Sequence, residues 1–525
     1  MKKSILIVCS LLLAAFLLIL LFGKAKQEIL SDSGGSRVWQ HSLPSAERWT
    51  GPDTIPDDGM LDSTFASHLP LLVIDTDGAV ITDARRSDEV NEASHYGDNV
   101  NPYSEMTLSV FDSGAVNTLS DEPSSVLAGK IKIRGGVSDG KLQYRMKFLD
   151  AYGDGVKVPL LGMNEDDVWI LNGMDKDETD LRSYIAYNLA GELNVSSPDV
   201  RFCEVLLKEA DGYRYLGLYL LTEPVERGEG RVVLKGKRNL VGAYSYIVKR
   251  GKADSDSVVL STWASESAGV SAFMGDVSSG ESVLSLIYPK NEKVTTDAIN
   301  YITSDISGIE QLLASDRIAV YASFAGVLDT ESFIDYYILN EYMMNRGAGT
   351  TSTYMYRDIG GKLTMGPVWG FNGAASHSSD IGLFLMKDAP FYSNLFKNSS
   401  FDRNLLKRYS VLRETLLSDE NISRLITEAR DYLGNALQRD LSLRGTDMET
   451  NMAETSVLLD TLMQRGTWLD NNIGSLAEHT VTTYRYAIVS VFSIILFAAL
   501  FTAATLLYEK RRAAGVSAVS GKGHV

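Results

Sequence analysis

The sequence predicts an α+β protein in two lobes, with a β-rich N-terminal part, a helix-rich C-terminal part and a transmembrane helix on either side. Three observations carry this prediction. Strand-like runs separated by turn residues fill the first half, helical periodicity dominates from Thr295 onward, and a long uncharged apolar run lies near each end. A chain of 525 residues is long enough for one large two-lobed domain or two ordinary domains.

The two apolar runs are residues 4–22 and 487–507. Each has about 20 residues, the length that crosses a bilayer as a helix. Cationic residues precede the first run and follow the second, and such flanks stay on the cytoplasmic side. The sequence therefore predicts a two-pass membrane protein with both termini in the cytoplasm and the region between the runs outside it.

A cleaved signal peptide is the alternative for the first run, with cleavage after Ala25 in the small-residue context Gly23-Lys24-Ala25. Its apolar stretch exceeds the roughly 7–15 residues of a signal sequence, which favours an uncleaved anchor. Both alternatives leave the middle of the chain outside the cytoplasm. The predicted divisions are an anchor (1–27), a linker (28–60), an ectodomain (61–475), a second transmembrane helix (483–508) and a cytoplasmic tail (509–525).

Charge and cysteine content exclude several classes of function. The formal net charge is −17. The ectodomain holds about 41 cationic and 65 acidic residues, a charge of about −24, which repels nucleic acid and anionic headgroups. Of the two cysteines, Cys9 lies in the first apolar run and Cys203 in a strand-like segment, so we expect no intrachain disulfide. Six scattered histidines without clustered cysteines give no basis for a structural zinc site.

The first half of the chain alternates between short apolar runs and turn residues. A Gly-rich turn at 135–140 joins two of these runs, Asp211-Gly212 joins two others, and a helix is predicted from Thr179 or Asp180 to Leu193. Thr179 or Asp180 is expected to cap that helix. The predicted strands are residues 69–74, 106–111, 131–133, 143–148, 201–207 and 213–221.

The second half is predicted to be mainly helical. Residues 252–282 are rich in Ser, Ala and Gly and are interpreted as a surface excursion. A long apolar helix over 332–344 is expected to be buried, and a β-hairpin over 353–365 follows it. Residues 405–444 predict one or two amphipathic helices, and 456–468 another. No repeat of fixed period is visible, which argues against a solenoid or a propeller.

An ordered series of short motifs spans roughly residues 69–444. Each motif is weak by itself, but together and in this order the chain resembles the spore coat protein H (CotH) kinase family, surface or secreted proteins with a divergent kinase-like fold. The matching motifs are Arg134-Gly135-Gly136, Lys147-Phe148, Trp169-Ile170-Leu171-Asn172, Asp180-Leu181-Arg182-Ser183, Ser197-Pro198, Gly217-Leu218-Tyr219, Thr222-Glu223, Tyr288-Pro289-Lys290, Leu339-Asn340-Glu341, Ser352-Thr353-Tyr354 and Gly366-Pro367-Val368-Trp369.

The resemblance implies ATP-dependent phosphoryl transfer to a protein, with Mg²⁺ bridging the phosphates. Such chemistry needs cations on the phosphates, a carboxylate for the metal and a carboxylate that orients the attacking hydroxyl. The cations nearest the Gly-rich turn are its candidate phosphate ligands, although a solvated basic strand face is the alternative. These are Arg134, Lys141, Arg145 and Lys147.

Three further residues belong to the nucleotide-binding candidates. Arg182 is either a phosphate ligand or an ion-pair partner of Asp177 or Glu178. Glu223 is either the partner of a phosphate-binding lysine or a solvated acid at a strand end, and Lys249 is similarly open between binding and surface roles.

At two decisive positions the sequence departs from the family. Where the family carries Trp-Asp-x-Asp or Trp-Asp-x-Asn, this chain has Trp369-Gly370-Phe371-Asn372, so the metal-binding aspartate is Gly370. The family also carries Asn-x-Asp, in which the aspartate is catalytic, and an Arg three residues later. This chain has Gly347 at the position of that aspartate and Thr350 at the position of that Arg. Glycine can neither hold Mg²⁺ nor orient a hydroxyl. Asn372 offers one neutral carbonyl oxygen as a weak metal ligand.

Asp380 is the remaining acid that would serve as a substitute metal ligand. Three functions therefore stay open: a pseudokinase that binds a surface or envelope protein, an active atypical kinase with substitute acids, and a surface adhesin or structural envelope protein. ATP and Mg²⁺ are doubtful cofactors under the first reading and required ones under the second.

Overall fold

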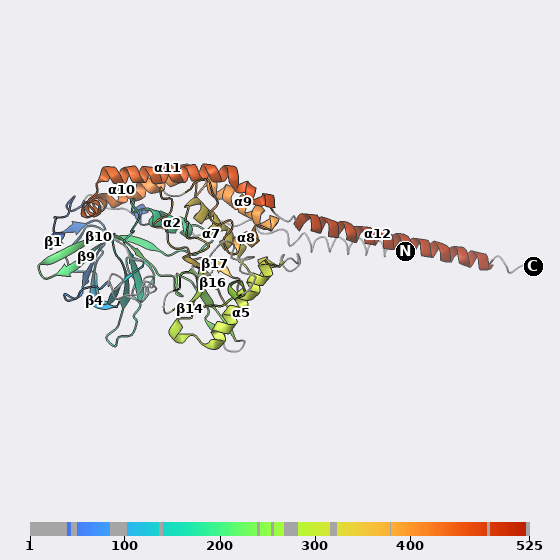
Figure 1. The fold of residues 1–525 in the computed structure, drawn as a ribbon, viewed down its shortest axis with the longest axis horizontal. Coiled ribbons are helices and arrows are strands. Elements are labelled where there is room, and N and C mark those ends of the chain that lie inside the picture. The colour runs from blue at the N-terminus through green and yellow to red at the C-terminus, as the bar shows by residue number, and fades with distance from the viewer. Residues whose placement is uncertain are drawn as a thin grey trace, which may run out of the picture. The chain divides into compact units, whose positions relative to one another are not determined.

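The computed structural model describes residues 39–43, 50–83, 102–135, 140–238, 242–253, 257–266, 282–315, 323–377, 380–479 and 483–520 (Figure 1). The larger of two compact units holds the described residues up to Lys397 and from Phe401 to His479, and the other contains the C-terminal helix. The first apolar run, residues 4–22, lies outside the described residues. The β-rich N-terminal part and the helical C-terminal part confirm the α+β prediction.

The N-terminal part of the larger unit is a closed β-barrel. Each strand pairs with its neighbours in the order β3-β4-β6-β7-β8-β10-β9, and parallel pairing of β9 with β3 closes the ring. The short strand β1 (Met60–Leu61) adds to β10 outside the ring. The ring strands are β3 (Leu71–Asp75), β4 (Ser104–Phe111), β6 (Ser125–Arg134), β7 (Gln143–Phe148), β8 (Val168–Asn172), β9 (Val200–Glu209) and β10 (Gly212–Thr222).

Period-two alternation explains the barrel, because every second residue of each ring strand points into one apolar interior. On β7, for example, Tyr144, Met146 and Phe148 are buried while the residues between them are half-buried. The interior also receives residues from the other six ring strands: Leu72, Ile74, Met106, Leu108, Val110, Ile131, Ile133, Trp169, Leu171, Cys203, Val205, Tyr219 and Leu221. Since the ring is closed, its strands leave few backbone groups unpaired.

The C-terminal part combines a second sheet with helices. The sheet has the order β14-β15-β13-β16-β17, and its strands are β13 (Tyr246–Gly251), β14 (Val258–Val259), β15 (Val283–Tyr288), β16 (Thr353–Arg357) and β17 (Thr364–Met365). The helices are α2 (Arg182–Gly191), α3 (Trp263–Glu266), α5 (Thr296–Leu313), α7 (Thr330–Tyr342), α8 (Tyr392–Leu395), α9 (Ser399–Glu414), α10 (Asp419–Leu443) and α11 (Met448–Asn472). Helix α3 and strand β14 lie within the stretch predicted as a loose excursion.

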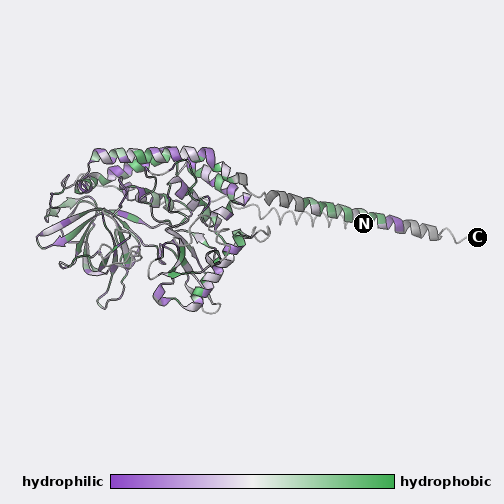
Figure 2. Cartoon of the chain, viewed as in Figure 1, coloured by the Kyte–Doolittle hydropathy of each residue, from purple (hydrophilic) through white to green (hydrophobic). Residues whose placement is uncertain are grey.

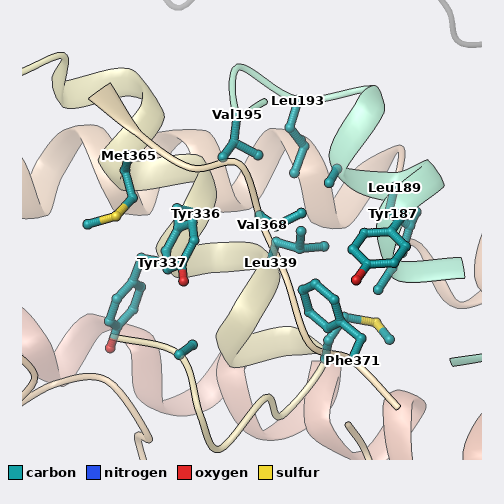
Figure 3. Packing of buried hydrophobic residues seen from close by; sticks show 14 of the residues in the cluster. Tyr187, Leu189, Leu193, Val195, Tyr336, Tyr337, Leu339, Met365, Val368 and Phe371 are labelled. Carbon is teal, nitrogen blue, oxygen red and sulfur yellow. The ribbon is translucent and has the colours of Figure 1, made fainter. Parts of the chain in front are cut away.

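Helix α7 is the centre of the largest apolar core, as the run of apolar residues predicts. All but one of its residues are buried. The segment that follows β17 runs past it, and Figure 3 shows Val368 and Phe371 of that segment beside Leu339 of α7 and Tyr187 of α2. This packing fixes the backbone on both sides of Gly370.

Helix α10 joins the helical part to the barrel through buried charges. Arg439 forms a two-pronged ion pair with Glu204 of β9, at 2.8 and 2.7 Å, and both side chains are fully buried. The next residue, Asp440, accepts hydrogen bonds from the Leu218 N–H and from Lys141 Nζ. Gly217 has φ +116° at a bulge in β10, and a side chain there would overlap the Asp440 carboxylate. Glycine therefore permits this contact.

The start of α2 corrects one prediction. Neither Thr179 nor Asp180 caps the helix: the N-cap position is Leu181, which makes no side-chain capping bond. Instead the Asp177 carboxylate accepts a hydrogen bond from the Arg182 N–H at 2.8 Å. Asp180 has φ +59° and pairs with Arg444 beyond α10. Asp177 could not be predicted as the acceptor, because it lies five residues before Arg182 and a capping residue ordinarily lies two or three residues before the N–H that it accepts.

Among the described residues, one helix is long and apolar enough to cross a membrane. This is α12 (Thr483–Ser520), in which residues 491–511 are exposed and strongly apolar. Figure 2 shows a hydrophobic stretch along this helix, followed by a hydrophilic one. It matches the second predicted transmembrane run.

Asp402 on α9 predicts a measurable pH dependence of stability. Asp402 is 1% exposed, and neither of its carboxylate oxygens has a hydrogen-bond partner among the residues that the structure describes. Burial raises the pKa of Asp402 to about 8, only partly offset by Arg403. Because the unfolded chain ionises this group near its ordinary pKa of about 4, the folded state loses stability as the pH rises from there toward 8.

We therefore expect Asp402→Asn to raise the melting temperature at pH 8.5 and to leave it almost unchanged at pH 4, in melts of the full chain in detergent. The exposed Asp431→Asn is the matched control on α10 and should give no such pH-dependent gain. A gain at pH 4 equal to that at pH 8.5 would contradict the assignment.

Candidate functional site

The two motif glycines lie against the same short stretch of chain. The first side-chain atom of a residue at Gly347 would meet Thr351 Oγ1 at 2.7 Å, and one at Gly370 would meet Ser352 Cβ at 3.5 Å. The loop after α7 and the loop after β17 therefore converge, as a catalytic and a metal-binding loop would. Ser352 has φ +50° and Met344 has φ +52°, so this region retains a strained backbone.

Gly370 occupies a backbone conformation that favours glycine. Its φ is +84° and its N–H donates to the Tyr187 hydroxyl at 3.3 Å. On the barrel side, the Arg134 guanidinium lies over the Trp369 ring at 5.7 Å. Arg134 thus lies beside this site. Its guanidinium stacks on the Trp369 ring, which is a different role from the phosphate contact that the sequence suggested.

Asn372 is committed to other protein groups. Its Oδ1 accepts hydrogen bonds from Asn172 Nδ2 at 3.0 Å and from Ser183 Oγ at 2.6 Å, while its Nδ2 donates to Asn172 Oδ1 at 3.0 Å. An amide oxygen accepts about two hydrogen bonds, so both acceptor positions are used. With glycine at 347 and 370, these three motif residues do not fit Mg²⁺.

The acids on the surrounding elements are also committed. Glu341 of α7 pairs with Arg465 and accepts two backbone N–H bonds, and burial raises its pKa. Asp335 pairs with Arg408. Asp380 is exposed and its carboxylate accepts the Gly382 N–H at 2.8 Å, which is a local turn contact. Among the described residues, none of these partners belongs to the glycine-bearing loops.

Two of the predicted phosphate ligands are held by carboxylates of the chain. Lys141 Nζ lies 2.6 Å from Asp440 Oδ1 and 2.6 Å from the Leu218 carbonyl oxygen, and its side chain is only 8% exposed. Arg145 Nη2 lies 3.0 Å from Glu226 Oε1. Lys141 is therefore a structural cation that connects the barrel to α10.

Arg182 and Glu223 also have structural partners. Arg182 is fully buried and pairs with Asp177 at 2.7 Å and with Glu178 at 2.8 Å, as the ion-pair alternative predicts. Glu223 accepts the Asp199 N–H and lies 3.4 Å from Arg231, and burial raises its pKa. Its cationic partner is an arginine of the segment after β10 rather than a lysine of the barrel.

Lys147 and Lys249 stand apart from these pairs. Both are half-buried, and neither has an ion-pair partner among the residues that the structure describes. Lys249 Cε and the backbone nitrogen of Ser352 both lie within 3.5 Å of the point where a side chain at Gly251 would begin. Lys249 therefore approaches the glycine-bearing loops from β13, whereas Lys147 lies on the barrel.

An acidic cluster that sequence reasoning missed lies elsewhere in the larger unit. Single carboxylate oxygens of Asp166, Asp167 and Glu226 lie within 4.8 Å of one another. Arg231 pairs with Asp166, and Lys290 pairs with Glu226 at 2.8 Å, so cations neutralise two of the three. Burial raises the pKa of Asp166 to about 6 despite Arg231. The run Glu165-Asp166-Asp167 was a visible signal, but nothing in the sequence places Glu226 beside it.

Comparison with known proteins agrees with the motif series. Among solved structures, the chain is similar to the "Shewanella oneidensis MR-1 Toxin Antitoxin System HipA, HipB and its operator DNA complex", at 14% identity over 65% of this chain and 67% of that chain, with a TM-score of 0.26. No curated protein matches. The description "CotH kinase protein" matches residues 131–469, which is more than half of the chain and includes both glycine-bearing loops. The chain therefore belongs to the CotH kinase protein family.

Proposed function

We propose that this chain is a membrane-held pseudokinase of the CotH kinase family, which transfers no phosphate and acts outside the cytoplasm by binding a surface or envelope protein. The observation that carries the proposal is the state of the three motif positions. Two are glycines, and the oxygen of the third is already saturated by Asn172 and Ser183.

The energetic argument is one of missing charge. Removing one electrostatic contact to a transition state typically costs about 3–4 kcal/mol, and contributions within one catalytic unit are not independent. Two carboxylates are absent here, and the described acids nearby pair with arginines or with backbone N–H groups. A scaffold that keeps its fold but lacks these groups is suited to binding rather than turnover.

The membrane part of the proposal has its own support. Residues 491–511 of α12 form an exposed helix whose apolar run ends at Leu507, and Lys510, Arg511 and Arg512 follow that run. Cationic residues after a span favour a cytoplasmic C-terminus, which puts the kinase-like region outside. The first apolar run would supply the second anchor.

The test is phosphate transfer by the purified full chain in detergent, with labelled ATP and either Mg²⁺ or Mn²⁺. We expect no label on the chain itself or on added acceptor proteins, for the wild type and for Asp380→Asn alike. Transfer by the wild type that disappears in Asp380→Asn would establish the active kinase instead.

A second measurement tests whether the two missing aspartates are what prevents MgATP from binding. We expect MgATP to leave the melting temperature of the wild type unchanged and to raise that of Gly347→Asp/Gly370→Asp. Ligand at a hundredfold excess over Kd stabilises by about 2.7 kcal/mol, which a melt detects readily. Without ligand, the double variant should melt lower, because Thr351 must move and Gly370 has φ +84°. A MgATP shift in the wild type would mean that a metal–nucleotide site persists.

A further inference from the structure

One cavity of the protein is lined by residues outside the glycine-bearing loops. It has a volume of about 510 Å³, within the range of small-molecule sites. Its wall is formed where the barrel loop before β8, the segment after β10, the end of β15 and the start of α5 meet. Apolar and aromatic lining comes from Tyr244, Ile287, Tyr288, Pro289 and Ala298.

Charged side chains give this cavity a cationic surface in an acidic protein. Four lining residues are cationic, and three are acidic. The negative charge of two of these acids is neutralised by arginines outside the cavity lining. Arg231 pairs with Asp166, and Arg145 pairs with Glu226. The cationic lining residues are Lys157, Arg227, Lys290 and Lys293.

Two of these cations are not used by the fold. Lys157 and Lys293 are exposed, and neither has an ion-pair partner among the residues that the structure describes. Arg227 donates to the Tyr288 hydroxyl at 3.1 Å and to the Leu234 carbonyl oxygen, and no carboxylate in the described part of the chain pairs with it. Since Tyr288 accepts from Arg227, its own hydroxyl proton is available to donate to a ligand.

The backbone adds charge of the same sign. Helix α5 has 18 residues and starts at the cavity, where Thr295 is its N-cap and Thr295 and Ala298 both belong to the lining. The N-terminal end of a helix carries a partial positive charge, which favours anions. Lysines, an arginine, a tyrosine hydroxyl and a helix end thus present donors to one cavity.

We propose that this cavity binds an anionic group, a phosphate or a carboxylate, carried by a ligand with an apolar or ring portion that packs against Tyr244 and Tyr288. The proposal does not depend on the pseudokinase assignment, because none of its residues belongs to the glycine-bearing loops. The anion is carried either by a small phosphorylated molecule or by the acidic side chains of a partner protein.

The test uses the full chain in detergent with EDTA, titrated at constant ionic strength with sodium pyrophosphate or with a capped tetraglutamate peptide. Binding is followed by the shift in melting temperature. We expect one probe to bind the wild type and to bind Lys157→Ala/Lys293→Ala about tenfold more weakly. The control Lys362→Ala/Lys407→Ala removes the same charge from exposed lysines outside the cavity and should bind as the wild type does.

Pyrophosphate binding would identify a small phosphorylated ligand, and peptide binding an acidic protein segment. Equal affinity in all three proteins, or no binding of either probe to the wild type at millimolar concentration, would overturn the proposal. Either of these outcomes leaves the phosphate-transfer assay unaffected, so the two proposals fail separately.

Discussion

Replacing Glu204 with glutamine is expected to lower the free energy of unfolding by about 3–5 kcal/mol, because it leaves the Arg439 guanidinium buried without its counter-charge. Both side chains are fully buried, and Glu204 also accepts the Tyr215 hydroxyl at 2.6 Å. Arg439 lies on α10 and Glu204 on β9, so the pair holds the helical part to the barrel. Urea unfolding of the full chain in detergent measures the loss.

Two comparisons make this result specific. Glu209→Gln removes the partner of Arg214 at the far end of the same strand, where both side chains are partly exposed, and should lower the free energy of unfolding far less than Glu204→Gln does. Replacing Glu204 and Arg439 together by leucine should cost less than Glu204→Gln alone, since no unpaired charge remains. A double variant less stable than the single one would mean that the charges themselves stabilise the contact.

Much of the fold could be predicted because local patterns determine it. Short apolar runs bounded by turn residues predicted the strands β4, β6, β7, β9 and β10, and the apolar run of α7 predicted a buried helix. Closure of the sheet into a barrel could not be predicted, because it depends on β9 pairing with β3 across more than 120 residues of chain. Periodicity identifies which residues face a core but not which distant strand completes it.

The candidate site shows the same division. The glycines at 347 and 370 follow from the order of motifs, and the structure places their loops against the adjacent residues Thr351 and Ser352. The roles of the cations could not be predicted, since Lys141 meets its carboxylate almost 300 residues later in the chain. A basic residue beside a Gly-rich turn gives the same sequence pattern whether it binds a phosphate or pairs with an aspartate far along the chain.

Lys141→Met should therefore destabilise the protein rather than merely weaken anion binding. We expect a loss of about 3 kcal/mol in the free energy of unfolding, because Asp440 is fully buried and loses one of its two cations. The Leu218 carbonyl also loses its contact with the ammonium. The same urea unfolding of the full chain measures the change.

Lys147→Met is the matched control, since Lys147 lies on β7 and has no ion-pair partner among the described residues. It should change stability by less than about 1 kcal/mol. If Lys141 were a phosphate ligand, Lys141→Met would unfold like the wild type and lose stabilisation by ATP. The buried Asp440 argues against a phosphate-binding role, because its carboxylate on α10 lies 2.6 Å from Lys141 Nζ and competes directly with any phosphate for that ammonium. Lys141 therefore stabilises the contact between the barrel and α10. A nucleotide phosphate could bind Lys141 only by breaking its ion pair with Asp440.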